Sequence, residues 1–182
     1  LYFHLCQHQC GDSQEQYYRL NREKFEREAK IIAHLDDLTG IVKVYDFFYE
    51  NDTVYMVLEY LDGINLKEYV KAQGGKLNVN EVTSKLNSVM SSLQNLHEHG
   101  ILHRDISPDN IMVLGDGSLK LLDFGGAKIQ ANTGLSNMVI AKKGYTPIEQ
   151  YHTDGNQGVW TDVYAMAATI YFCITGQVPE ES

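Results

Sequence analysis

The feature that most constrains the fold is a pair of short apolar runs joined by a tight turn. The runs occupy residues 111–114 and 119–122, and Gly-Asp-Gly at residues 115–117 separates them. Apolar runs on either side of a Gly/Asp turn are typical of an antiparallel β-hairpin. The sequence therefore predicts a hairpin, whose two open ends must lie side by side.

Three side chains with oxygen atoms flank this predicted hairpin. Asp105 and Asn110 precede its first strand, and Asp123 follows its second strand. Because a hairpin brings its two ends together, we expect the three side chains to lie close together at its open end. Carboxylate and amide oxygens suit hard cations and phosphate chemistry better than they suit a soft metal.

Two motifs overlap these residues. His-Arg-Asp-x-x-x-x-Asn fills residues 103–110, and Asp-Phe-Gly begins thirteen residues after Asn110. With a hairpin between them, the motifs closely resemble the catalytic core of eukaryotic-type protein kinases, in the style of bacterial serine/threonine kinases. The resemblance implies an α+β, kinase-like two-lobe fold. It also implies an enzyme that transfers the γ-phosphate of ATP to a protein Ser/Thr hydroxyl.

The resemblance divides the chain into two parts. Residues 1–61 correspond to a partial N-lobe with the αC helix and antiparallel strands. Residues 62–182 correspond to a partial, mainly helical C-lobe. The Gly-rich loop and the β3 lysine of the family have no counterpart here, and neither have the last helices of the C-lobe. We therefore expect the sequence to be a fragment of a kinase, truncated at both ends.

Capping signals and apolar stripes predict helices over residues 13–38, 65–73, 79–99 and 160–175. For the third of these, Asn78 and Glu81 have the spacing of a capping box, and Gly100 is the expected stop. Two further apolar runs, residues 41–49 and 54–60, predict an antiparallel hairpin before the second helix.

The resemblance assigns a role to each residue of the core. Asp105 orients the substrate hydroxyl and accepts its proton, while Asn110 and Asp123 hold Mg²⁺ against the phosphates. Glu28, on the first predicted helix, stands where the family has its ion-pairing glutamate. Arg104 is expected to pair with a phosphate on the loop that follows the hairpin.

That loop, residues 126–143, resembles the activation segment, and Thr133 and Ser136 are its candidate phosphorylation sites. A Pro-Ile-Glu sequence ending in Glu149 resembles the anchor that closes the segment. In the family this glutamate pairs with an arginine from helices that have no counterpart here, so we expect Glu149 to lack its basic partner. Asp162, at the start of the last helix, is expected to hold the catalytic loop's backbone from beneath.

The resemblance also implies contacts to the nucleotide. Glu59 and Leu61 belong to the expected hinge, where backbone groups read the adenine. Asn65, just beyond the hinge, is placed for a polar contact to the ribose. Met112 and Ser107 complete the expected ATP-binding residues.

Ser107 departs from the family pattern. Serine/threonine kinases usually have a lysine at this position, and Lys142 falls where their activation segment has a threonine. We hypothesise that the two positions have exchanged roles, with the Lys142 amine reaching the phosphate over Ser107. The alternative is a surface Lys142 and a merely tolerated Ser107.

Composition narrows the choice of partners and compartment. The formal net charge of −9 over 182 residues argues against nucleic acid or an anionic membrane as the main partner. The kinase resemblance implies a protein substrate and ATP instead. Three cysteines, an odd number without a framework pattern, fit a reducing cytoplasm. The chain contains no apolar run of the roughly 18 residues that a membrane segment needs. The sequence predicts no oligomeric state.

Some alternatives remain open at this stage. Residues 4–10 contain alternating His and Cys side chains, which could form a soft-metal site or be incidental. The chain could also be a pseudokinase, that is, a nucleotide-binding or regulatory module without transfer. A small-molecule phosphotransferase shares the Asp…Asn…Asp arrangement, but it generally lacks the His-Arg-Asp, Asp-Phe-Gly and Pro-Ile-Glu motifs found here.

Overall fold

The computed structural model describes residues 2–4, 30, 38–50, 53–122, 128–129, 142–152 and 155–180. The chain divides into two compact units: Leu1–Leu38 with Val42–Tyr60, and Thr39–Ile41 with Leu61–Ser182. Most of the helix predicted over residues 13–38 lies outside the described residues. Lys30 is described, and it is helical.

The first unit contains a three-stranded antiparallel sheet. Its strands are β1 (Tyr2–His4), β2 (Val44–Glu50) and β3 (Thr53–Leu58), in the order β1-β3-β2. Phe48 and Tyr55 are cross-strand partners, and their rings stack with centroids 5.2 Å apart. Aromatic pairs of this kind stabilise adjacent strands. The hairpin predicted over residues 41–60 is therefore confirmed, with narrower bounds.

The predicted start of that hairpin was three residues too early. Ile41 forms a parallel bridge with Leu121 of the second unit's sheet instead of continuing β2. The bridge is reinforced by two hydrogen bonds at Gly40, whose carbonyl accepts from the Leu121 N–H at 2.8 Å and whose N–H donates to Ser92 Oγ at 2.9 Å. Both contacts are long-range in the sequence, so no local pattern reveals them.

The hairpin that follows the catalytic motif forms as predicted. β6 (Ile111–Leu114) pairs antiparallel with β7 (Leu119–Leu121). A third strand, β4 (Gly63–Asn65), pairs with the other edge of β6 and was not predicted from the sequence. Its three residues are exposed or half-buried, so they lack the apolar pattern of a strand.

The longest helix is α3 (Val79–Glu98). Five apolar residues at helical spacing along it are all buried: Val82, Leu86, Val89, Leu93 and Leu96. The predicted capping box is wrong, because Asn78 Oδ1 accepts from the N–H of Asn80 and Glu81 Oε1 instead accepts from the Tyr69 hydroxyl at 3.1 Å. Gly100, with a φ of +72°, follows the end of the helix as expected.

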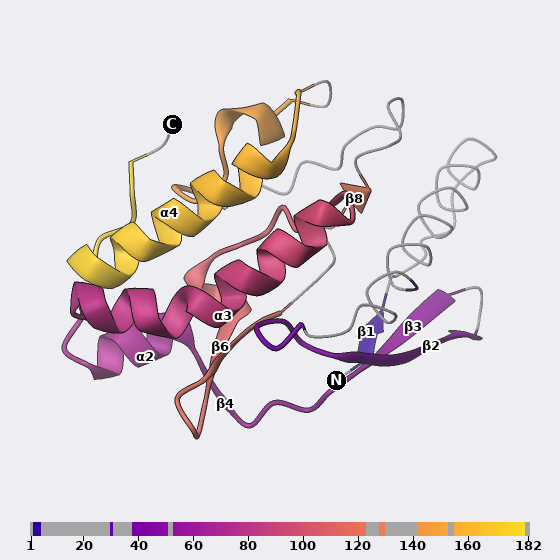
Figure 1. The fold of residues 1–182 in the computed structure, drawn as a ribbon, viewed down its shortest axis with the longest axis horizontal. Helices are drawn as coiled ribbons and strands as arrows, with labels where there is room; N and C mark the ends of the chain where they lie inside the picture. Colours follow the sequence, from indigo (N-terminus) through magenta and orange to yellow (C-terminus); the bar gives the residue numbers. More distant parts are fainter. Residues whose placement is uncertain are drawn as a thin grey trace. The chain divides into compact units, whose positions relative to one another are not determined.

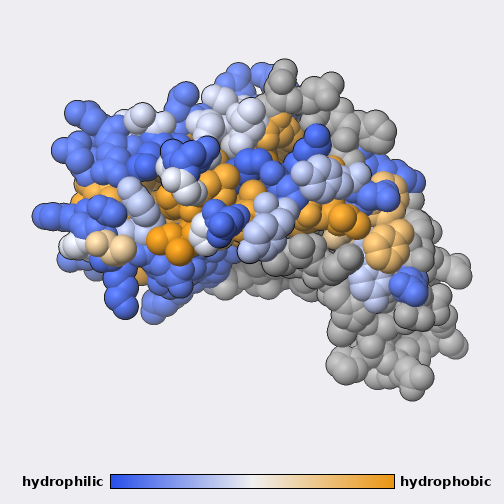
Figure 2. Space-filling view, turned by 90° about the horizontal axis from the view of Figure 1, so that it is seen from below, coloured by the Kyte–Doolittle hydropathy of each residue, from blue (hydrophilic) through white to orange (hydrophobic). Residues whose placement is uncertain are grey.

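Two further helices flank α3 in sequence. α2 (Leu66–Ala72) is capped by Asn65, and α4 (Val159–Thr175) ends at Gly176, which has a φ of +74°. α4 packs beside α3, and the two run side by side in Figure 1. Both predicted helices are therefore confirmed. Figure 2 shows one face of the protein coloured by residue hydropathy, and hydrophobic residues lie among hydrophilic ones on it.

Short elements complete the second unit. β5 (Ile101–Leu102) pairs with β8 (Lys128–Ile129), and the 3₁₀ helices are η1 (Pro108–Asn110) and η2 (Ile148–Gln150).

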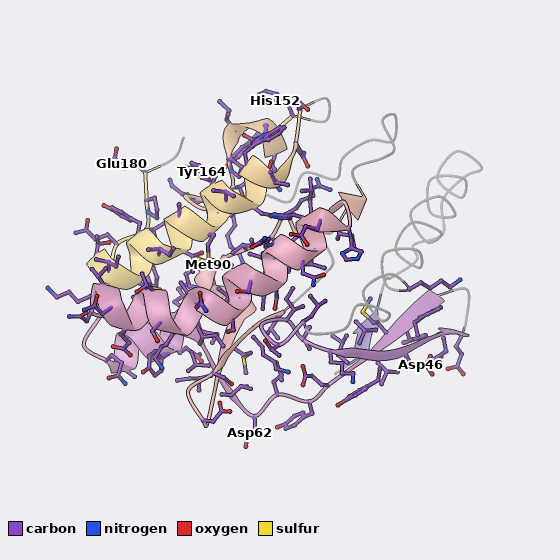
Figure 3. The ribbon with its side chains drawn as sticks, viewed as in Figure 1. Asp46, Asp62, Met90, His152, Tyr164 and Glu180 are labelled. Carbon is purple, nitrogen blue, oxygen red and sulfur yellow. The ribbon has the colours of Figure 1, made fainter. Side chains whose placement is uncertain are left out.

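An apolar groove of about 580 Å³ lies between α3 and α4, and Met90, labelled in Figure 3, lines it. None of the helices in the described ranges has the length and apolar character that crossing a membrane would require.

Candidate active site

The centre of the candidate site is the hydrogen-bonded pair Asp105 and Asn110. Asn110 Nδ2 donates to Asp105 Oδ2 at 2.7 Å and to the Asp105 backbone carbonyl at 2.9 Å. The backbone of Asn110 is fixed too, since its N–H donates to the Ser107 carbonyl at 3.0 Å across η1. These bonds hold the Asp105 carboxylate in one orientation.

The hairpin returns the chain to this pair. The N–H of Leu122, the residue before Asp123, donates to the Asn110 carbonyl at 2.7 Å. The Leu122 carbonyl accepts from His103 Nε2 at 3.0 Å. His103 Nδ1 is correspondingly an acceptor, for the N–H of Asp105 at 3.4 Å. Asp123 lies outside the described residues, but the backbone leading to it is bonded to both ends of the catalytic loop.

Asp162 holds the loop from beneath, as expected. Its side chain is fully buried, and it accepts the N–H of His103 at 2.8 Å and the N–H of Arg104 at 2.7 Å. His97 Nε2 donates to the same carboxylate at 2.8 Å. Three donors thus compensate for burying this charge, which would otherwise be very costly.

The hydrogen bonds to Asp162 explain how Arg104 can keep an unfavourable backbone conformation. Arg104 has a φ of 69°, and among the described residues it is the one non-glycine in this region. The left-handed conformation costs an L-residue about 1–2 kcal/mol. Asp162 stabilises it from the N–H side, and Gln150 Nε2 donates to the Arg104 carbonyl at 2.9 Å. The sequence predicted no role for Gln150, whose only signal there was its place directly after Pro-Ile-Glu at residues 147–149.

Glu149, the last residue of that anchor, has a neutral partner. Its Oε1 accepts from the Thr161 hydroxyl at 2.9 Å, and Thr161 Oγ1 accepts from the N–H of Gly158 at 3.2 Å. The sequence predicted a carboxylate without its basic partner. The donor found here, a hydroxyl in the first turn of α4, is neutral and does not replace an arginine.

Lys142 and Ser107, the two positions hypothesised to have exchanged roles, are in contact. Lys142 Nζ donates to Ser107 Oγ at 2.8 Å and lies 3.9 Å from Asp105 Oδ1. The lysine side chain is 32% exposed and that of Asp105 is 16% exposed. The structure therefore places an ammonium group at the catalytic loop, beside the carboxylate.

The residues expected to contact the nucleotide lie in both units. Asn65 and Met112 are register partners on β4 and β6. Asn65 Oδ1 already accepts from the N–H of Glu68 at 2.8 Å, as the cap of α2. In the first unit, Glu59 Oε1 accepts from the N–H of Lys43 at 2.7 Å. Leu61 belongs to the second unit.

Several sequence predictions fall outside the described residues. These are the ion-pairing role of Glu28, the phosphorylation sites Thr133 and Ser136, and the alternating His and Cys residues up to Cys10, of which only the backbone of His4 is described. Within the described ranges, no three His, Cys, Asp or Glu side chains are grouped so that they could hold a metal ion.

The family model described as the protein kinase domain matches residues 10–182 of the sequence. The chain belongs to the protein kinase domain family. A solved structure described as the apo form of PpkA-294 superposes with a TM-score of 0.72 and 32% identity, covering 94% of this chain and 60% of that one.

Curated relatives agree with this assignment. The serine/threonine-protein kinase PrkC of Bacillus subtilis is 34% identical over 158 residues, covering 86% of this chain and 24% of PrkC. The serine/threonine-protein kinase PknA of Nostoc is 34% identical over 175 residues, covering 91% of this chain and 30% of PknA. The chain therefore spans about a quarter to a third of the length of these relatives.

Proposed function

We propose that this chain carries the phosphoryl-transfer site of an ATP-dependent kinase that acts on Ser or Thr hydroxyls of proteins. Membership of the kinase family and the names of the relatives support the reaction class. The observation that carries the proposal is the double hydrogen bond from Asn110 to Asp105, which orients a carboxylate at the end of the hairpin.

In the proposed reaction, the substrate hydroxyl oxygen forms a bond to the γ-phosphorus of ATP. The bond from that phosphorus to the β–γ bridging oxygen breaks, and ADP leaves. The hydroxyl proton passes to Asp105, which later releases it to solvent. Such reactions ask the protein mainly for positioning and charge stabilisation, and the anchored loop supplies the positioning.

The residues present fit a divalent cation. Because Asn110 Nδ2 is engaged with two oxygens of Asp105, Oδ1 is the amide atom that can serve as a ligand. The amide oxygen of Asn110 and the carboxylate of Asp123 would together provide the hard oxygen ligands that Mg²⁺ prefers. When bound, the ion neutralises charge on the phosphates.

The remaining residues keep their proposed roles. Arg104 would pair with a phosphate on the segment that follows the hairpin, and Glu28 would form the family's ion pair. The nucleotide would contact the hinge at Glu59 and Leu61, and further residues at Asn65 and Met112. For Asn65 the contact to ribose would come from Nδ2, since Oδ1 caps α2.

We also propose that the protein works in a reducing, cytoplasmic compartment. Cys173 is a free thiol that is buried on α4, and burial raises the pKa of this thiol to about 12. A buried, protonated thiol fits a structural role and a compartment in which disulfides are rare. Site-resolved thiol labelling in intact cells would contradict the proposal if the three cysteines were found oxidised.

The test of the proposed function is transfer of labelled γ-phosphate from Mg²⁺·ATP to a generic protein substrate, followed by identification of the phosphorylated amino acid. Phosphoserine or phosphothreonine is the expected product. Small alcohols such as choline or an aminoglycoside are offered in parallel. Transfer to these alone would mean a small-molecule phosphotransferase, and ATP binding without any transfer would mean a pseudokinase.

A further inference from the structure

The backbone around Lys142 is fixed by a tight turn. The N–H of Lys142 donates to Thr146 Oγ1 at 2.7 Å, and its carbonyl accepts from the N–H groups of Tyr145 and Thr146 at 2.9 and 3.0 Å. Gly144 has a φ of +79°, and a Cβ there would lie 2.5 Å from the Pro179 carbonyl oxygen. The turn therefore packs closely on the segment after α4, which gives the lysine side chain a rigid base.

The amine itself lies between two oxygens of the catalytic loop. Ser107 precedes η1 but makes no side-chain capping bond to it. Its hydroxyl instead accepts from Lys142 Nζ at 2.8 Å, at a position where Ser107 is fully buried. An ammonium group has three donors. Ser107 accepts one, and the Asp105 carboxylate lies at ion-pair distance, 3.9 Å. The group can therefore still donate to a third ligand.

The charges at the site favour a phosphoryl group as the third ligand of this ammonium group. The Asp105 carboxylate and a phosphoryl group carry charges of the same sign, so bringing them together for transfer is unfavourable. An ammonium group beside the carboxylate offsets this repulsion and stabilises the negative charge of the moving phosphoryl group. A simple exposed ion pair would not require the buried hydroxyl of Ser107 as a support.

We propose that Lys142 is a catalytic residue that binds the transferred phosphoryl group, and that Ser107 positions its amine. This inference rests on the proposed function and names a residue that handles the phosphate in the same site. Lys142 Nζ donates to a non-bridging oxygen of the γ-phosphate before and during transfer, and no covalent bond to the lysine forms.

The test compares Lys142→Met with Lys143→Met, the same change at the exposed neighbouring position. Turnover is measured together with the affinities for ATP and ADP by titration calorimetry. Lys142→Met is expected to lower kcat about 100-fold. It should weaken ATP binding about tenfold, as expected for a lost charge-assisted hydrogen bond, and leave ADP binding unchanged. Lys143→Met should change none of these values.

A second variant tests the position of the amine. Adding Ser107→Lys to Lys142→Met returns an ammonium group to the loop, and kcat should recover at least about tenfold over Lys142→Met alone. Unfolding temperatures of all variants are measured alongside. Unchanged turnover in Lys142→Met would overturn the proposal, and so would equal losses of ATP and ADP binding with a lowered unfolding temperature.

The two proposals fail in different ways. If the natural protein phosphorylates proteins and Lys142→Met does so equally well, the role of Lys142 falls and the kinase function stands. If the natural protein transfers nothing but Lys142→Met selectively loses affinity for ATP over ADP, the transfer function falls and the assignment of Lys142 to the γ-phosphate stands.

Discussion

The carboxylate of Asp162 accepts the backbone N–H of Arg104 at 2.7 Å, joining the first turn of α4 to the residue directly before Asp105. The two residues are 58 positions apart in the sequence. Since Arg104 has a left-handed backbone, the loop's shape depends on this contact as well as on the motif itself. The geometry of the candidate site is thus set partly by a helix that contributes none of its proposed catalytic residues.

Replacing Asp162 by Asn should destabilise the protein strongly. The amide offers one acceptor oxygen in place of two, while three donors converge on the buried position. We expect the free energy of unfolding to fall by about 3 kcal/mol, measured by urea denaturation. Asp62→Asn is the control, at an exposed position labelled in Figure 3, and should have little effect. Equal effects of the two changes would show that Asp162 is not an anchor.

Ser92 should matter for stability, and its neighbour Ser91 should not. Ser92 is buried and its hydroxyl accepts the N–H of Gly40, whereas the neighbouring Ser91 is exposed. Ser92→Ala leaves a buried N–H without its acceptor and should cost about 2 kcal/mol. Ser91→Ala, the same change one position earlier, should cost close to nothing. Urea unfolding of both variants distinguishes them, and matching midpoints would refute the role of the Gly40 contact.

The stability of the protein should decline in alkaline solution through Tyr145. Burial, with smaller contributions from Asp109 and Cys173, raises the pKa of Tyr145 from 10.0 to about 12. The folded state therefore holds this proton more tightly than the unfolded chain. The resulting stabilisation is complete below pH 10 and is lost as the pH rises from about 10 to 12.

Tyr145→Phe removes this titration. The free energies of unfolding of the natural protein and of the Phe variant are compared by urea denaturation from about pH 8 to about pH 11.5. The difference between them should be constant up to about pH 10 and should then shift in favour of the variant. A difference that stays constant over the whole range would mean that the Tyr145 hydroxyl titrates normally.

Much of the second unit was predictable because its signals are local. The hairpin of β6 and β7 follows from two apolar runs and a Gly/Asp turn, and the core face of α3 follows from apolar spacing. The convergence of Asp105 and Asn110 also follows, since they are only five positions apart. In each case the interacting groups are close in sequence, so their pattern can be read without knowing the fold.

The missed features depend on partners that are distant in sequence. β4 is recognised only by its pairing with β6, and β5 only by its pairing with β8. The Gln150 contact to Arg104 spans 46 positions. Glu81 has the spacing of a capping box, yet a tertiary contact with the Tyr69 hydroxyl prevails over that local bond. Such competition between local and tertiary contacts is decided by packing, which no single segment encodes.

The most direct test of the central claim is the turnover of Asp105→Asn, measured beside its affinity for ATP. The change keeps the side chain's shape but removes its ability to accept the hydroxyl proton. We expect kcat for transfer to protein to fall by at least about 100-fold, while the ATP dissociation constant and the unfolding temperature stay close to those of the natural protein. A variant that keeps its turnover would contradict the account, because the reaction would then not depend on the carboxylate held by Asn110.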